Sequence, residues 1–132
     1  DLGPDGDGRQ RSMSVNVMPL GDDFDAATFL QFYVPMPFEV PDALVVDVGY
    51  AAAKVNAAMA LGHFAVSDSG EVYFRYMQAF SSSTAADPAA SAQIVMMLDF
   101  HQETFGDVVQ GVAEGEIDVA VVDQVIAAVT AG

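Results

Sequence analysis

The segment from Ala51 to Phe80 is the part of this 132-residue chain that most constrains its fold. It reads AAAKVNAAMALG, HFAVSD, SG and EVYFRYMQAF, which indicates a helix that stops at Gly62 and passes directly into a β-hairpin turned at Ser69-Gly70. Because such a hairpin is antiparallel, the segment favours an α+β domain in which helices pack on an antiparallel sheet. We find no catalytic motif within it.

The hydrophobic patterns outside this segment predict the remaining elements. Residues 11–18 alternate apolar and polar side chains, which predicts a half-buried strand. Pro35 and Pro37 lack a backbone N–H, so the end of the second strand should lie at a sheet edge or leave the sheet. The expected fold is an α+β domain with an antiparallel sheet of two hairpins and helices packed on one face. Its expected elements are strands at 11–18, 27–39, 63–68 and 71–80, and helices from 42 to the stop at 62, at 88–114 and at 117–130.

The sequence also predicts where the helices begin and which of their residues are buried. Asp42 is the expected N-cap of the first helix, and Asp87 followed by Pro88 is a start signal for the second. The second helix is expected to bury a row with alternating spacings of four and three: Ile94, Leu98, His101, Phe105, Val108 and Val112. The last helix is expected to bury Ile117, Val121, Val125 and Val129.

Length and composition indicate one domain. Residues 1–10 are rich in Gly, Asp and Pro and are expected to form a flexible N-terminal segment, and residues 11–132 a single α+β domain. The first residues do not resemble a signal peptide, and no apolar run is long enough to cross a bilayer. With no cysteine, disulfides and thiol catalysis are excluded, and we expect a cytoplasmic protein.

The charge balance limits the partners. The chain has 19 acidic and four basic residues, a net charge of −15. Phosphate groups are bound by clustered Lys and Arg, so we expect neither nucleic-acid nor membrane binding. The acidic residues are spread along the chain, which is typical of a solvated surface, although attraction to a basic partner is an alternative.

Metal and catalytic chemistry have little support. His63 and His101 are the only histidines, and neither has a second ligand at metal-binding spacing. The loops with Asp1, Asp5 and Asp7 and with Asp22, Asp23 and Asp25 do not match a calcium loop. No GxSxG, P-loop or GxGxxG motif is present, and a Ser-His-Asp site assembled in space has no local support. We therefore expect a protein that is not an enzyme and carries no cofactor or metal.

The second face of the sheet is the best candidate for function. If helices cover one face, the other carries aromatic, Met and Arg side chains, which are enriched at protein interfaces. The alternative is that the terminal helix folds over this face. Asn56 lies in an Ala-rich helix, either exposed or bonded to a neighbouring backbone or to Arg75. The residues expected on the candidate face are Phe29, Gln31, Tyr33, Tyr73, Arg75 and Met77.

The segment KVNAAMALGHFAVSDSGEVYFRY resembles the YbjN-type domain, which has the type III secretion chaperone-like fold. The features that match are Asn56, Leu61-Gly62, Phe64, Asp68-Ser69-Gly70 and Phe74-Arg75, and the resemblance extends over about residues 11–115. The family usually begins with a helix and a further strand before the first strand expected here. The resemblance implies a small protein, often dimeric, that is chaperone-like or regulatory, and it supplies no catalytic residues.

These observations predict a non-enzymatic protein-interaction module, a homodimer or a binder of a protein or peptide partner. It would act through its second sheet face or by pairing at an open sheet edge. The competing hypothesis is a small-ligand sensor or an undetected enzyme that uses a pocket between sheet and helices.

Overall fold

The computed structural model describes residues 3–4, 10–18, 27–81 and 88–131. Its main sheet has four antiparallel strands in the order β3-β4-β6-β5. Two hairpins, β3–β4 and β5–β6, meet through the long β4–β6 ladder, so the predicted α+β fold with a sheet of two hairpins is confirmed. The strands of this sheet are β3 (Ser14–Met18), β4 (Ala27–Glu39), β5 (His63–Val66) and β6 (Glu71–Ser81).

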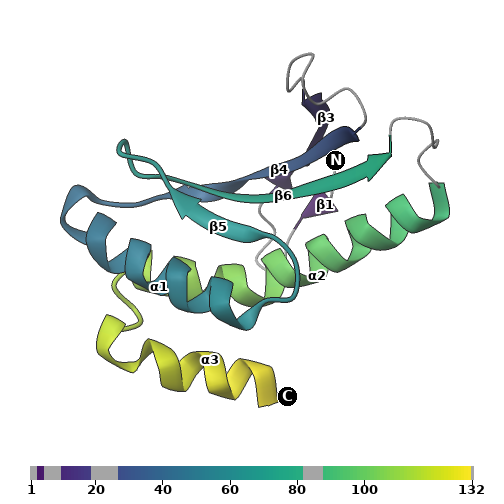
Figure 1. Ribbon diagram of the computed structural model, residues 1–132. Coiled ribbons are helices and arrows are strands. Elements are labelled where there is room, and N and C mark those ends of the chain that lie inside the picture. Colours follow the sequence, from purple (N-terminus) through teal and green to yellow (C-terminus); the bar gives the residue numbers. More distant parts are fainter. Residues whose placement is uncertain (1–2, 5–9, 19–26, 82–87, 132) are drawn as a thin grey trace.

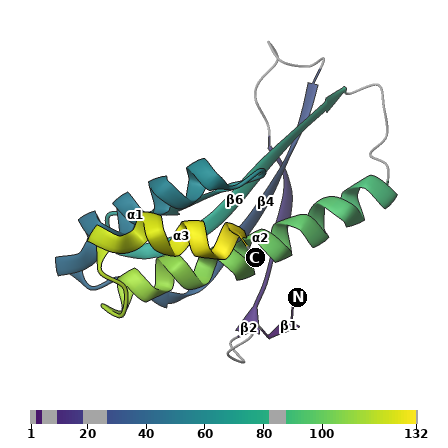
Figure 2. The same ribbon diagram turned by 90° about the horizontal axis from the view of Figure 1, so that it is seen from below.

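The helices form two layers below the sheet (Figure 1). Helices α1 (Val45–Ala58) and α2 (Pro88–Ala113) lie directly under the strands. Helix α3 (Val122–Ala131) packs beneath α1 and α2 (Figures 1 and 2). The core lies between the sheet and the first helical layer, where its most deeply buried side chains include Val34, Phe64, Phe74, Val48, Val55, Leu98 and Val109.

The alternation of side chains along β4 and β6 explains which face of the sheet is buried. Phe32 and Val34 on β4 and Phe74 on β6 point toward the helices and are buried. Past Tyr33, β4 no longer pairs with β3, and its register with β6 shifts between Pro35 and Glu39. The two prolines thus lie where the ladder is one-sided and irregular, as their missing N–H groups require.

Three expected helix ends are wrong. The chain enters α1 through a 3-10 turn at Asp42–Leu44, and no side chain caps either start, so Asp42 is not an N-cap. Helix α1 ends at Ala58 rather than Gly62, because Met59 is already extended. Gly62 instead turns the chain into β5 with a φ of 77°. Asp118 caps a 3-10 turn at Val119–Val121 through its side chain, so the last helix begins later than expected.

That later start changes which residues the last helix buries. Val121, expected in the buried row, is 39% exposed, whereas Val122 is 1% exposed. Ile126 is buried one turn further on. Ile117 precedes the helix and packs beside Gly111 of α2, where a Cβ on the glycine would overlap its side chain. Ile117, Val125 and Val129 of the predicted row pack against the core as expected, whereas Val121 does not, and Val122 and Ile126 take the most buried positions.

The first strand also differs from expectation. Strand β3 is shorter than residues 11–18, and its apolar row is not half-buried: Val15 is 49% and Val17 is 64% exposed. Both valines lie on the helix side of the sheet, opposite Phe32 and Leu30, but at its outer strand. Only Met13 of the predicted row packs against the core.

The expected flexible segment at residues 1–10 is paired in part. Strand β1 (Gly3–Pro4) pairs antiparallel with β2 (Gln10–Arg11). The predicted cap at Asp87 and the two aspartate-rich loops lie outside the described residues.

Candidate interaction surface

The register of β4 and β6 brings the predicted face together. Gln31 lies opposite Met77, Tyr33 opposite Arg75, and Pro35 opposite Tyr73. Because partners directly opposite in an antiparallel pair project to the same side, these side chains share the side of the sheet away from the helices. We call this surface the open face and define it by Phe29, Gln31, Tyr33, Tyr73, Arg75 and Met77.

The open face is partly shielded by its own side chains. The rings of Tyr33 and Tyr73, diagonal neighbours on adjacent strands, lie 5.3 Å apart between centroids. All six residues of the face are half-buried rather than fully exposed. Contact between the Tyr33 and Tyr73 rings restricts their positions, so this part of the open face is already ordered before any partner binds.

No described helix lies over this face. Helix α3 contacts α1 and α2, in a layer separated from the open face by the first helices and the sheet itself (Figure 1). The alternative that the terminal helix folds over these residues is therefore wrong.

Arg75 gives the open face a positive charge. It lies between Tyr33 on β4 and His63 on β5. Burial lowers the pKa of His63 below its ordinary value, and the neighbouring guanidinium of Arg75 lowers it further. The Nε atom of Arg75 is buried and has no hydrogen-bond partner in the described part of the chain.

A hollow lies where β4 and β6 lose their regular register. It has a volume of about 420 Å³, and the residues lining it include Tyr33, Pro35, Glu39 and Glu71. Glu39 and Glu71 are direct cross-strand partners. Like charges in this relation repel each other, so the two carboxylates make this end of the open face strongly negative.

Asn56 is bonded to a neighbouring backbone, the second of the roles considered for it. Its side-chain amide donates to the carbonyl of Phe64 at 3.0 Å, and its oxygen accepts from the Phe64 N–H at 2.7 Å. Phe64 belongs to β5, an edge strand of the sheet. The carboxamide thus occupies the place that a further strand would take at that residue, which opposes strand addition at this edge.

A second apolar surface, on helix α2, was missed from the sequence. Met96 is 70% exposed, Phe100 is 63% exposed, and Met97 is also exposed. These residues fall outside the buried row of Leu98 and Phe105, and their apolar type at off-row positions was the available signal. We call Met96, Met97 and Phe100 the α2 patch.

Another hollow lies between α1 and the 3-10 turn before α3. Its volume is about 340 Å³, and Val46, Tyr50 and Val119 supply its apolar walls. Asp47 and Asp123 lie at the same hollow, and Asp123 pairs with Lys54 at 3.5 Å.

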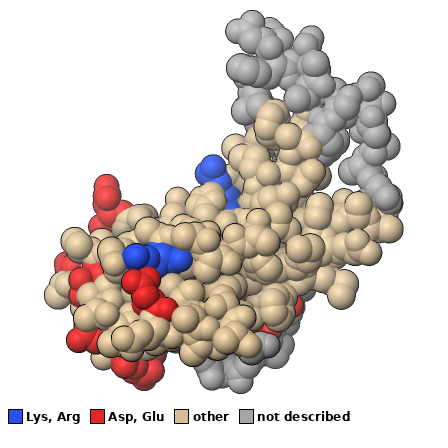
Figure 3. Space-filling model, turned by 60° about the horizontal axis from the view of Figure 1, so that its bottom comes forward, with Lys and Arg blue, Asp and Glu red and all other residues tan. Residues whose placement is uncertain are grey.

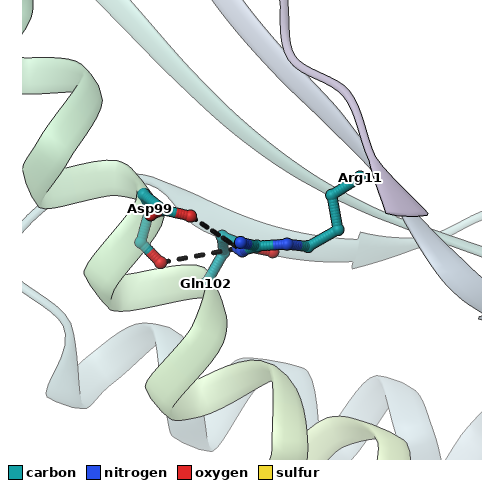
Figure 4. Close-up of polar contacts among 3 residues, drawn as sticks. All are labelled: Arg11, Asp99 and Gln102. Atoms are coloured by element: carbon teal, nitrogen blue, oxygen red, sulfur yellow. Dashed lines mark hydrogen bonds and ion pairs between the residues drawn. The ribbon is translucent and has the colours of Figure 1, made fainter. Parts of the chain in front are cut away.

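The shorter of the two ion pairs among the described residues joins β2 to α2. Arg11 of β2 is 5% exposed and bonds Asp99 of α2 through Nη1 at 2.7 Å (Figure 4). Gln102, also buried, donates to the Asp99 carboxylate at 3.2 Å. Arg11 is buried while the Asp99 side chain is 36% exposed, so losing Asp99 would leave a buried guanidinium without its charge partner; this contact therefore holds β2 against α2.

Among the described residues, acidic side chains gather toward one end of the molecule in the view of Figure 3. In that view the described surface on the right, beside the grey atoms, shows neither red nor blue side chains. In the sequence, 27–38 and 88–98 have no Asp, Glu, Lys or Arg. These stretches of β4 and α2 therefore add no charge repulsion to an association.

The described residues contain no group of three His, Cys, Asp or Glu side chains that could hold a metal ion. His101 is half-buried between the rings of Phe100 and Phe105, and its Nδ1 has no partner among the described atoms. None of the described helices is long and apolar enough to span a membrane.

Comparison of the sequence with protein-family models and with curated proteins gives no match.

Proposed function

We propose that this protein is a non-enzymatic interaction module that forms a homodimer through its open face. The observation that carries the proposal is the row of Phe29, Tyr33, Tyr73 and Met77 on a sheet face that no described helix covers. Large aromatic side chains, Met and Arg are the types that interfaces enrich.

Two observations favour dimer formation through the open face over strand pairing at the edge of β5. Asn56 occupies the backbone groups of Phe64 at that edge. The face of a rigid sheet also loses little conformational entropy on binding, because its side chains are already packed against each other.

We further propose that the module is chaperone-like or regulatory and works in the cytoplasm. The support is the resemblance of the Asn56–Arg75 segment to the YbjN-type domain. The lack of cysteine is compatible with a reducing compartment.

The test is a pair of substitutions on the open face, Tyr33→Asp with Met77→Asp, measured by light scattering. We expect the unmodified protein to have the mass of two chains and the variant to have the mass of one. The carboxylate at position 77 would be buried in the interface without a partner, and the one at position 33 would lie opposite Arg75, so we expect association to be lost. Circular dichroism checks that the variant is folded, and if it is not, Gln31→Lys, a polar-to-charged change on the same face, takes its place.

Met96→Asp on the α2 patch is the matched control. It replaces a methionine by a carboxylate, as Met77→Asp does, but on a helix, so we expect the dimer to persist. A monomeric unmodified protein, or a dimer that Met96→Asp dissociates and the open-face variants do not, contradicts the proposal.

Thermal-shift measurements against metabolites and metal ions address the competing ligand-sensor function. A ligand present at many times its Kd raises the unfolding temperature measurably. A specific shift that is lost in Tyr50→Ala, at the hollow beside α1, would favour a sensor over an interaction module.

A further inference from the structure

Arg75 is the one cation of the described residues that has no ion pair. Arg11 pairs with Asp99, and Lys54 pairs with Asp123. Arg75 is flanked instead by Tyr33 and His63, which carry no negative charge to balance it. Burial lowers the pKa of His63, and the guanidinium of Arg75 beside it lowers this pKa further.

Two carboxylates on the same face also lack a cation. Glu39 and Glu71 lie opposite each other at the hollow beside Tyr33 and Pro35. Neither belongs to an ion pair in the described part of the chain, where the pairs are Arg11–Asp99 and Lys54–Asp123. The open face therefore carries an unbalanced positive group and an unbalanced negative pair.

These groups cannot neutralise each other within one chain. Glu71 and Arg75 are four residues apart on β6, which separates their Cα atoms by about 13 Å along an extended strand. Tyr73 projects between them on the same side. A second copy can bring them together, because a two-fold interface places residue i against j and j against i.

We propose that two copies of this chain pack open face to open face, with Arg75 of each copy seated in the Glu39/Glu71 hollow of the other. A two-fold axis that crosses the strands near Tyr73 places Arg75 of one copy over Glu71 of the second, and the reverse. A guanidinium can donate to both carboxylates and stack on the Tyr33 ring at the wall of the hollow. The inference rests on the proposed dimer and specifies how its two open faces align, which we call the register of the dimer.

The charge of the face favours a second copy over a basic partner. Apart from Glu39, Glu71 and Arg75, the strand residues on this side of the sheet are uncharged or histidine. Self-association thus brings together two faces with one cation and two anions each, although each chain has a net charge of −15. A second copy supplies a cation to the carboxylate pair and carboxylates to the cation at the same time.

The test is charge reversal, with the dimer Kd measured by sedimentation. Arg75→Glu and Glu71→Arg should each raise the Kd about thirty-fold or more, since each leaves a charge unpaired in the interface. The double variant Glu71→Arg with Arg75→Glu recreates the pair with its signs exchanged, and its Kd should return to within about three-fold of the original.

The two single variants separate pairing from overall repulsion. Glu71→Arg changes the net charge from −15 to −13, so the weaker repulsion between the chains would by itself strengthen the dimer. Glu103→Arg, at an exposed position on α2, makes the same change in net charge away from the face and is the control. We expect Glu103→Arg to leave the dimer unchanged or tighter and Glu71→Arg to weaken it.

The outcomes distinguish this register from the dimer itself. If Glu71→Arg behaves like Glu103→Arg, or the double variant is not rescued, the register is wrong, while the response to Tyr33→Asp with Met77→Asp still decides the dimer. Tight binding of an arginine-containing peptide by a monomeric protein would overturn the second copy as the occupant. If a reversal variant is unfolded by circular dichroism, the neutral changes Glu71→Gln and Arg75→Gln should each weaken the dimer.

Discussion

Asn56→Ala tests how the edge of the sheet is closed. The substitution removes two hydrogen bonds, of 2.7 and 3.0 Å, from the backbone of Phe64. Each bond contributes about 1 kcal/mol, and stranding partly buried backbone groups adds about 1 kcal/mol more. Alanine recovers about 0.5 kcal/mol because it favours the helix. We therefore expect the free energy of unfolding to fall by about 2–3 kcal/mol.

Urea unfolding followed by circular dichroism measures this loss. With a slope of about 1–3 kcal/mol per molar urea, the midpoint should fall by about 1 M or more. Gln124→Ala, which removes an exposed amide from helix α3, is the control and should change stability by less than about 0.5 kcal/mol. Faster hydrogen exchange at the Phe64 amide identifies the site. A loss below about 0.5 kcal/mol, or unchanged exchange at Phe64, would refute the assigned role.

Two further predictions concern Gly62 and His63. Gly62→Ala should lower the free energy of unfolding by about 3 kcal/mol or more in urea unfolding, because its φ is 77° and a Cβ would overlap the buried Phe74 ring. Gly49→Ala, where a Cβ meets nothing, should be neutral or stabilising, and equal effects at both sites would contradict the steric reason. The pKa of His63 is below its ordinary 6.5, so the unfolded chain takes up the proton first and stability should decline as pH falls through about 6.5 toward the folded pKa. In NMR titrations Arg75→Gln should raise that pKa and Lys54→Gln should not; no change with Arg75→Gln would remove Arg75 as a cause.

Local periodicity was sufficient to predict the layers of the fold. The β4 and β6 alternation predicted the two sheet faces, and the spacing of Leu98 and Phe105 predicted the inward row of α2. These patterns are reliable because each depends on one element whose period is fixed by backbone geometry. The residues proposed for the open face come together for the same reason, once β4 and β6 pair.

The errors occur where a feature depends on tertiary position. Val15 and Val17 alternate like core residues, yet β3 is the outer strand and the helices do not extend over it far enough to bury them. Helix α3 begins at Val122, after a 3-10 turn that Asp118 caps, rather than at residue 117 as the apolar pattern suggests. Aspartate is a common N-cap residue, but at Asp42 the chain enters helix α1 through a 3-10 turn that no side chain caps. Residue type alone does not specify these outcomes.

The Glu39/Glu71 hollow is a tertiary feature of the same kind. Sequence reasoning found Arg75 on β6 but had no means to place Glu39 opposite Glu71, because a register shift after Pro35 determines that pairing. A regular ladder continued from Pro35 and Tyr73 would have placed residue 37, not Glu39, opposite Glu71. The two extra residues in β4 therefore position both carboxylates together on the face that carries Arg75. If the dimer forms as proposed, this irregularity, introduced where two prolines already interrupt the ladder, determines its register.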